Sequence, residues 1–331
     1  DEPWYGEAPR RVLVLGSDAR PGGDAAVHRM DSIHILTAVP ELGAGAILGY
    51  PRDTWGDTAY GAMRLNALTS SGRGPDALFE HFTEAWEIPL EGYILTGFRG
   101  FENLIAATIG RLTVTIPIPI PAQQEFPGFR SGEQTLTPAR TLDFSRTRKL
   151  IPGGDFTRSF HHGIVMLAAL TAIQDGTMED LPTLLEPLSQ FTSTNLTATD
   201  LIQLGAIAME MDIADITNEV LPGQLGRAGG GQSVVFLDEG YEAIVDDVAS
   251  LVAGGPPVAI LLAEPGGEQI AAVGDGTLSE PGRYLILCAI PTGADADDYL
   301  AAAATSEGPP QIDGGAPHFT HGMFAEIVVT G

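Results

Sequence analysis

Residues 11–55 read RVLVLGSDARPGGDAAVHRMDSIHILTAVPELGAGAILGYPRDTW, and this stretch decides the fold. It holds three short apolar runs that are rich in valine, isoleucine and leucine: Val12–Leu15, Ile33–Val39 and Ala46–Tyr50. Glycine, proline and aspartate residues bound these runs, and their length and composition predict strands buried in a sheet rather than helices. The polar residues of the stretch cluster at the strand ends.

These polar residues predict a charged site at one edge of the sheet. Antiparallel neighbours place the end of one strand beside the start of the next. If the three strands pair in sequence, Asp18, Arg29, Asp31 and Arg52 therefore gather at one rim. Mg²⁺ usually takes one or two protein carboxylates and completes its shell with water and phosphate. Arginine grips phosphate oxygens in pairs, so the set favours a divalent cation facing a phosphate group.

Two later motifs also have spacings that suit phosphate binding. Arg146 and Arg148 lie two residues apart, which on an extended segment places both on one face, where they can hold one pyrophosphate. Asp155 fits a helix N-cap, and Asp155, Arg158 and His162 follow the i, i+3, i+7 spacing of one helical face. The start of such a helix itself attracts anions.

The charged motifs follow one another as GSDAR at 16–20, RMDS at 29–32, PRDT at 51–54, RTR at 146–148 and GDFTR at 154–158. Each motif is weak alone, but the ordered set is specific. It resembles the extracytoplasmic LytR-CpsA-Psr (LCP) family, whose members join lipid-carried glycopolymers to the bacterial wall. The resemblance covers residues 11–251 and implies an α/β fold with a three-layer α-β-α core around a mixed sheet.

The resemblance implies a phosphotransferase that moves a glycopolymer phosphate from a polyprenyl-pyrophosphate carrier to peptidoglycan, with pyrophosphatase as a side activity. Mg²⁺, with Mn²⁺ as a substitute, would be held by Asp18 and Asp31. The substrate pyrophosphate would be bound by Arg29, Arg52, Arg146, Arg148, Arg158 and His162. Asp53 and Asp155 are the two candidates for the group that orients this network or accepts the acceptor's proton, and the sequence does not choose between them.

Two positions depart from the family pattern, and two others match it outside the five motifs. The family usually has arginine followed by glutamine where this chain has His161 and His162. Histidine can donate a hydrogen bond to phosphate, but its charge varies with pH. Arg64 and Asn66 match a family position that reaches toward the site, although Asn66 fits a helix cap equally well.

The composition excludes one class of partner. A net charge of −26 disfavours a nucleic acid, because such binding depends on cationic side chains that displace counterions along the phosphate backbone. The single cysteine, Cys288, excludes an intramolecular disulfide. No apolar run approaches the roughly 18 residues of a membrane span. Because family members carry an N-terminal membrane helix and this sequence begins at Asp1, we expect a processed or truncated form of an extracytoplasmic, membrane-anchored envelope protein.

Composition also divides the chain. Residues 1–10 read as an N-terminal stalk, 11–251 as the catalytic domain, and 252–257 as a glycine- and proline-rich linker. Residues 258–331 form a small β-rich module with strands expected at Val258–Ala263, Tyr284–Ile290 and Ala325–Thr330.

The C-terminal module resembles the end of a cupredoxin domain, since Cys288, His318, His321 and Met323 are of the ligand types of a blue-copper site. A further histidine is expected upstream, and residues 252–287 contain none. We therefore expect a degenerate module rather than a functional copper site.

Elsewhere the residue pattern predicts a strand at Tyr93–Phe98 and helices at Pro75–Trp86 and Phe101–Ile109. A helix capped by Thr137 follows, because proline stands at its first position. The closing part of the domain is expected to contain a hairpin over 221–231 and a final helix over 238–251.

Two alternatives belong to other functional classes. A non-catalytic protein that binds polyprenyl phosphate or the cell wall would bind the lipid without turnover, and the His161 and His162 departures would then mark lost chemistry. A copper-binding accessory protein centred on the C-terminal module would contain stoichiometric copper and absorb strongly in the blue-copper band.

Overall fold

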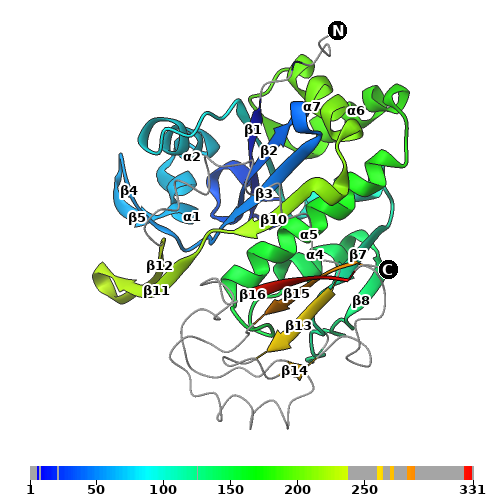
Figure 1. Cartoon of the computed structure of the whole chain (residues 1–331). Coiled ribbons are helices and arrows are strands. Elements are labelled where there is room, and N and C mark those ends of the chain that lie inside the picture. The colour runs from blue at the N-terminus through cyan, green and yellow to red at the C-terminus, as the bar shows by residue number, and fades with distance from the viewer. Residues whose placement is uncertain are drawn as a thin grey trace.

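The computed structural model describes residues 6, 9–20, 22–124 and 126–237, with Ser71 as backbone only, and the backbone of four C-terminal strands. Its centre is a six-stranded mixed sheet in the order β10-β3-β2-β1-β6-β9 (Figure 1). The strands of this sheet are β1 Arg10–Ser17, β2 Met30–Val39, β3 Ala44–Tyr50, β6 Gly92–Gly97, β9 Ser193–Thr194 and β10 Ile216–Val220.

The first three strands pair in sequence, as the apolar runs predict. β1 is antiparallel to β2, with Leu13 opposite Ile35, and β2 is antiparallel to β3, with Ile35 opposite Leu48. β6 lies parallel to β1 and β10 parallel to β3, which makes the sheet mixed. Every residue of β3 is buried, as expected of a strand covered on both faces.

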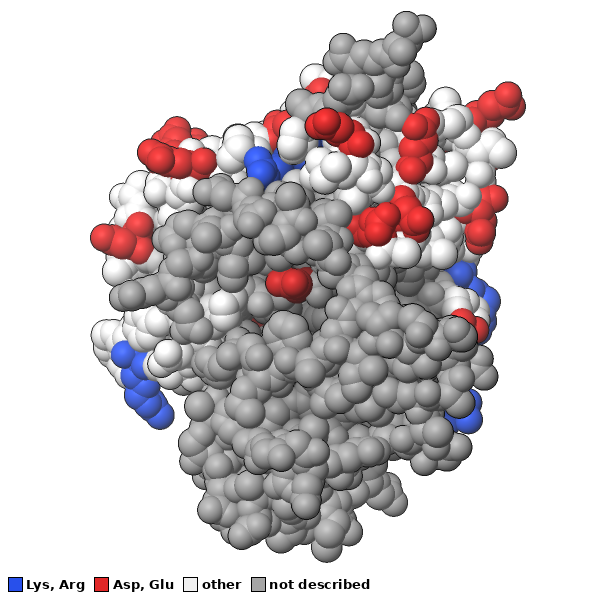
Figure 2. All heavy atoms as spheres, viewed as in Figure 1, with Lys and Arg blue, Asp and Glu red and all other residues white. Residues whose placement is uncertain are grey.

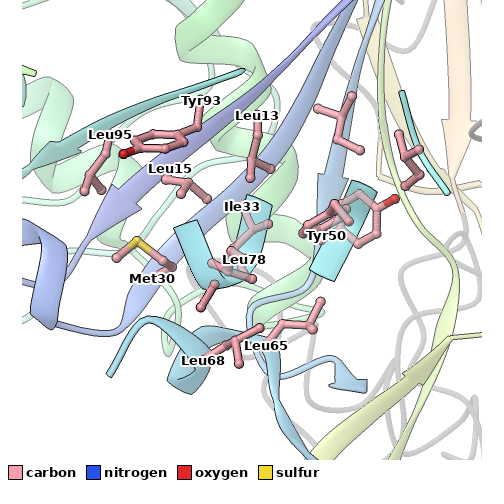
Figure 3. Packing of buried hydrophobic residues seen from close by; sticks show 14 of the residues in the cluster. Leu13, Leu15, Met30, Ile33, Tyr50, Leu65, Leu68, Leu78, Tyr93 and Leu95 are labelled. Atoms are coloured by element: carbon pink, nitrogen blue, oxygen red, sulfur yellow. The ribbon is translucent and has the colours of Figure 1, made fainter. Parts of the chain in front are cut away.

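One face of the sheet packs on α1, Leu65–Leu68, and α2, Pro75–Glu80, which is followed by a π-helical turn at His81–Ala85. Figure 3 shows this core, in which the strand residues Leu13 and Ile33 face Leu65 and Leu78. The helix predicted at Pro75–Trp86 is confirmed in place, although its second half is π-helical. Short 3₁₀ turns lie at Ala25–Val27, Pro40–Leu42, Thr69–Ser71, Met178–Asp180, Ile213–Asp215 and Gly229–Gly231.

The opposite face packs on α5, Asp155–Gln174, and α7, Ala198–Glu210. Ile47 of β3 and Ile216 of β10 meet Ile207 of α7 there. Helices on both faces confirm the predicted three-layer α-β-α core (Figure 1). The remaining helices of the described core are α3 Phe98–Thr108, α4 Pro138–Arg146 and α6 Leu181–Phe191.

Three two-stranded sheets extend this core. The pair β7, Leu112–Ile116, and β8, Gly132–Leu136, packs with α4 and α5 around Phe144 and Val165. The hairpin β4, Trp55–Thr58, with β5, Gly61–Arg64, follows β3 directly. The hairpin β11, Gly223–Ala228, with β12, Gln232–Leu237, confirms the hairpin predicted from the sequence.

The C-terminal module contributes a four-stranded sheet in the order β14-β13-β15-β16. Its strands are β13 Ala259–Ala263, β14 Gln269–Ala271, β15 Gly282–Leu287 and β16 Phe324–Val329, so the three strands predicted in this region are confirmed. The copper-type residues from Cys288 to Met323, the helix expected at 238–251 and the linker at 252–257 lie outside the described residues. Within the described residues, no helix has the length and apolar character needed to cross a membrane.

Candidate active site

The pairing of β1, β2 and β3 brings the predicted charged residues to one rim of the sheet, formed by residues 17–20, 28–31 and 51–54. The Asp18 backbone N–H donates to the Arg29 carbonyl at 2.9 Å, directly beside the pair Ser17 and Met30. Arg52 follows β3 and forms an ion pair with Asp31. The prediction that these residues gather at one rim is confirmed, because antiparallel pairing sets the end of one strand beside the start of the next.

Helix α5 completes the rim with a second ion pair. The Arg158 guanidinium contacts Asp155 one turn before it, and its Nη1 lies 3.6 Å from Oδ2 of Asp31. Asp155 in turn accepts a hydrogen bond from the Arg52 backbone N–H at 2.8 Å. Asp31, Arg52, Asp155 and Arg158 therefore form one closed network that ties the ends of β2 and β3 to the start of α5.

Asp53 gathers a second set of donors. Its Oδ1 accepts from Asn66 Nδ2 at 3.2 Å and from Arg64 Nη1 at 3.4 Å. Its Oδ2 lies 3.5 Å from Nη2 of Arg148, and Arg52 Nε lies 3.6 Å from Oδ1. The Asp53 backbone carbonyl also accepts from Val235 of β12 at 2.9 Å, so both main chain and side chain are held.

The electrostatics of this site are those of buried, paired charges. Arg158 and Asp155 are 4% and 6% exposed. Burial acts to lower the pKa of Arg52, but the neighbouring Asp31, Asp53 and Asp155 carboxylates outweigh it and hold that pKa above its ordinary value. The guanidinium groups of Arg52 and Arg158 are therefore held in position by their ion pairs before any ligand binds.

Two other arginines of the predicted set make no ion pair with any described residue. Arg29 and Arg146 are exposed, and Arg146 lies over the ring of Phe98 at 4.3 Å. Arg148 is intermediate, with a side chain 41% exposed and its single 3.5 Å contact to Asp53. The cations of the rim thus range from Arg52 and Arg158, which aspartates hold at half-buried and buried positions, through the partly exposed Arg148, to the exposed Arg29 and Arg146.

Several local predictions are corrected by the structure. Arg146 and Arg148 do not share an extended segment, because Arg146 is the last residue of α4 and the backbone becomes extended only at Thr147. Asp155 is not the N-cap of α5 but its first helical residue, since Gly154 precedes it with φ 51°. Asn66 is no helix cap, because α1 begins at Leu65 and the Asn66 amide donates to Asp53.

The two histidines that depart from the family pattern lie beneath the rim. His162 donates from Nε2 to the Ser145 carbonyl at 2.7 Å, a contact other than the predicted one with phosphate. His161 stacks on Phe144 at 4.4 Å, and burial lowers its pKa to about 3. His34 was not predicted as part of this region, although it is a polar residue inside the apolar run Ile33–Val39. It contacts the Ser159 carbonyl of α5 through Nε2 at 3.0 Å.

The carboxylates at the rim fit a magnesium ion in type and number. Asp18 and Asp31 come from neighbouring strand ends, and Mg²⁺ commonly takes only one or two carboxylates beside substrate phosphate. Among the described residues, the Nδ1 of His28 lies 3.8 Å from Oδ1 of Asp18. No group of three or more His, Cys, Asp or Glu side chains in the described part of the chain has the geometry of a metal site.

Comparison with protein families places these residues in context. The model described as the LytR_cpsA_psr family matches residues 5–246, which include every residue of the rim. The chain is 26% identical over 208 residues to the polyisoprenyl-teichoic acid–peptidoglycan teichoic acid transferase TagV of Bacillus subtilis. This alignment covers 58% of this chain and 53% of TagV. It is 29% identical over 160 residues to TagU of Bacillus cereus, covering 48% and 50%. The chain thus matches about half the length of these curated relatives.

Solved structures share the fold. The crystal structure of B. subtilis TagV aligns with a TM-score of 0.60 at 23% identity, covering 76% of this chain and 99% of that one. Protein gbs0355 of Streptococcus agalactiae aligns with a TM-score of 0.62 at 19% identity, covering 80% and 92%. A structure of TagT bound to LI-WTA aligns with a TM-score of 0.60 at 19% identity, covering 76% and 94%.

Proposed function

Because this chain belongs to the LytR-CpsA-Psr family, we propose that it transfers a glycopolymer phosphate from a polyprenyl-pyrophosphate carrier to a hydroxyl of peptidoglycan. Hydrolysis of the pyrophosphate, with water as the acceptor, is the side activity of the same site. The observation that carries the proposal is the rim itself, where four arginines from separate parts of the chain converge on three buried or half-buried aspartates.

Phosphoryl transfer requires mainly charge neutralisation and alignment. The more exposed arginines neutralise the diphosphate charge, and the arginines held by aspartates align the diphosphate. The exposed Arg29 and Arg146 and the partly exposed Arg148 bind the incoming diphosphate. The half-buried Arg52 and the buried Arg158 hold it in line, because Asp31 and Asp155 fix their guanidinium groups in advance. The acceptor oxygen bonds to the phosphorus that carries the glycan, and the bond from that phosphorus to the polyprenyl phosphate oxygen breaks.

Mg²⁺, or Mn²⁺ in its place, would be held by Asp18 and Asp31 and would neutralise phosphate charge when bound. The chain's own carboxylates divide the remaining work. Both oxygens of Asp155 already accept from Arg52 and Arg158, which suits it to orient arginines. Oδ2 of Asp53 has one contact among the described residues, with Arg148 at 3.5 Å, so this oxygen has lone pairs left to receive the acceptor's proton.

The relatives' printed names support the choice of carrier and acceptor, since TagV and TagU are named as polyisoprenyl-teichoic acid–peptidoglycan transferases. We place the protein in the cell envelope on that basis. Its extracytoplasmic location, and its anchoring to the membrane by an N-terminal helix that is not in this sequence, are parts of the same proposal.

The test measures release of polyprenyl phosphate from a polyprenyl-pyrophosphate sugar with the metal removed by EDTA and then restored as Mg²⁺ or Mn²⁺. We expect activity only with restored metal, and a loss of about 100-fold or more in Asp31→Asn. Binding of the lipid with no turnover under any of these conditions would instead identify a non-catalytic binding protein. Full activity in both Asp31→Asn and Arg146→Met would overturn the assigned roles.

A further inference from the structure

The C-terminal end of helix α4 has a buried backbone carbonyl, that of Ser145, which finds no partner within the helix. The last four carbonyls of a helix have no partner within it. Ser145 is the second-to-last residue of α4 and is 8% exposed, so water does not replace the missing partner at its carbonyl. A buried carbonyl without a partner is costly, which makes the group that satisfies it important.

His162 of α5 supplies that partner across 17 positions of sequence. Its Nε2 lies 2.7 Å from the Ser145 oxygen, and because a carbonyl only accepts, this nitrogen carries the proton. Its Nδ1 is buried with no hydrogen-bond partner among the described residues, which fits the unprotonated nitrogen of a neutral ring. Burial, together with the neighbouring His34 and Arg158, holds the pKa of His162 well below its ordinary value.

Two of the arginines proposed to bind the diphosphate follow Ser145 closely in the sequence. Arg146 follows Ser145 directly, and its guanidinium stands over Phe98. Arg148 follows two residues later and reaches Asp53. The direction in which the chain leaves α4 therefore decides where both guanidinium groups point.

We propose that His162 is a positioning residue, which caps α4 through the Ser145 carbonyl and so fixes the segment 146–149 at the rim. The inference rests on the proposed function in one respect, that this segment binds a diphosphate. His162 does not contact the diphosphate, because its only N–H is used by the carbonyl. Its neighbour His34 is occupied in the same way, with Nε2 on the Ser159 carbonyl and Nδ1 on the Ser32 hydroxyl.

The experiment compares His162→Gln with His162→Met in the whole chain. The glutamine amide can still donate to the carbonyl, whereas methionine has similar length and no donor. Trypsin cuts after Arg146, Arg148 and Lys149 only when this segment opens, and cleavage after the exposed Arg73 serves as the internal reference. In His162→Met we expect cleavage in 146–149 to rise about tenfold relative to Arg73, and the Kd for geranylgeranyl diphosphate, measured by calorimetry, to rise about tenfold. His162→Gln should stay within about twofold of the wild type in both.

Two results would overturn the proposal: a glutamine variant as impaired as the methionine variant, or a methionine variant that matches the wild type. Imidazole ¹⁵N NMR of the wild type decides the case even if the methionine variant does not fold, since we expect a proton on Nε2 alone and a proton on Nδ1 would refute the cap. None of the cleavage and NMR readouts needs a substrate. If the wild type does not bind geranylgeranyl diphosphate although segment 146–149 is protected from trypsin, the proposed function is refuted. The role of His162 as the cap of α4 is not.

Discussion

At the scale of single residues, Asp53 connects more of the site than any one motif suggests. Its carboxylate meets donors from the turn after β3, from β5, from α1 and from the loop after α4, and its carbonyl meets β12. Because several donors already fix the position of this carboxylate, it need not reorient during the reaction. The arginines around it are similarly fixed, and they differ mainly in how deeply they are buried.

Asp53→Asn tests whether the negative charge itself is needed. The amide keeps the size of the side chain but cannot accept a proton and repels Arg64 and Arg148 through its NH₂ group. We expect transfer activity to fall by about 100-fold or more. Asp57→Asn, four residues away on an exposed position of β4, is the matched control. An equal loss in the two variants would remove the special role of Asp53.

The buried Arg158 and the exposed Arg146 predict different effects of substitution on stability. Arg158→Met leaves Asp31 and Asp155 without their buried partner, so we expect the free energy of unfolding to fall by about 3–5 kcal/mol. Arg146→Met removes only an exposed guanidinium and its contact with Phe98, so we expect a change below about 1 kcal/mol together with weaker diphosphate binding. Urea unfolding and calorimetry measure the two quantities. Similar losses of stability in both variants would contradict this division.

At the scale of elements, α5 holds the rim in place because it lies unusually close to the sheet. Gly163 lies where an added Cβ would be 1.8 Å from Oδ1 of Asn218 on β10. The Asn218 amide donates to the Phe160 carbonyl of α5 at 3.0 Å, and His34 of β2 contacts the Ser159 carbonyl. Side chains of two strands thus bond directly to the helix backbone, which fixes the level at which Asp155 and Arg158 meet the rim.

Gly163→Ala measures this close approach. The new methyl group must push α5 away from β10 or displace Asn218, so we expect a loss of about 1–3 kcal/mol of stability and reduced activity. In the double variant with Asn218→Ala, part of the loss should return, because the obstructing amide is gone. Gly229→Ala is the control, since no atom lies within 4 Å of its added Cβ. Additive losses in the double variant would show that the two residues do not meet.

At the scale of the whole molecule, two charge patterns coexist. The chain has a net charge of −26, and Figure 2 shows many acidic side chains on the described surface. The site concentrates guanidinium groups against this background. Beneath the site, burial lowers the pKa of His34 to about 4 and of His161 to about 3, and that of His162 lies well below its ordinary value. All three rings are neutral in the folded protein at neutral pH.

The low pKa values of His34, His161 and His162 predict that the free energy of unfolding falls as the pH is lowered. Because their pKa values are lower in the folded than in the unfolded chain, the unfolded chain binds more protons as pH falls below about 6.5. The free energy of unfolding should therefore fall between pH 6.5 and about 4, by on the order of 1 kcal/mol per pH unit for each histidine. Urea unfolding at several pH values measures the slope.

His161→Phe provides the matched variant for this slope. It keeps a ring against Phe144 and removes one titrating group that makes no hydrogen bond within the described residues. We expect a shallower slope in this variant than in the wild type. A wild-type stability that is constant from pH 6.5 to 4.5 would contradict the neutral buried cluster.

The sequence by itself determined the order of the three central strands, their antiparallel pairing and the gathering of Asp18, Arg29, Asp31 and Arg52 at one rim. Apolar runs bounded by polar residues carry this information locally, because a strand must bury its apolar side chains and leave charges at its ends. The strands of the C-terminal module were predictable for the same reason. The parallel addition of β6 and β10, and the end of α4 at Arg146, were not.

Only the tertiary structure decided which charges pair and which remain exposed. Asp53 meets Arg148 across 95 positions, and His162 caps α4 across 17, so no local spacing reveals either contact. The spacing rule for Arg146 and Arg148 failed because the helix continues to Arg146, where tertiary packing sets the helix end. Local patterns record burial and direction along one segment, whereas the partner of a buried polar group depends on how separate segments are brought together.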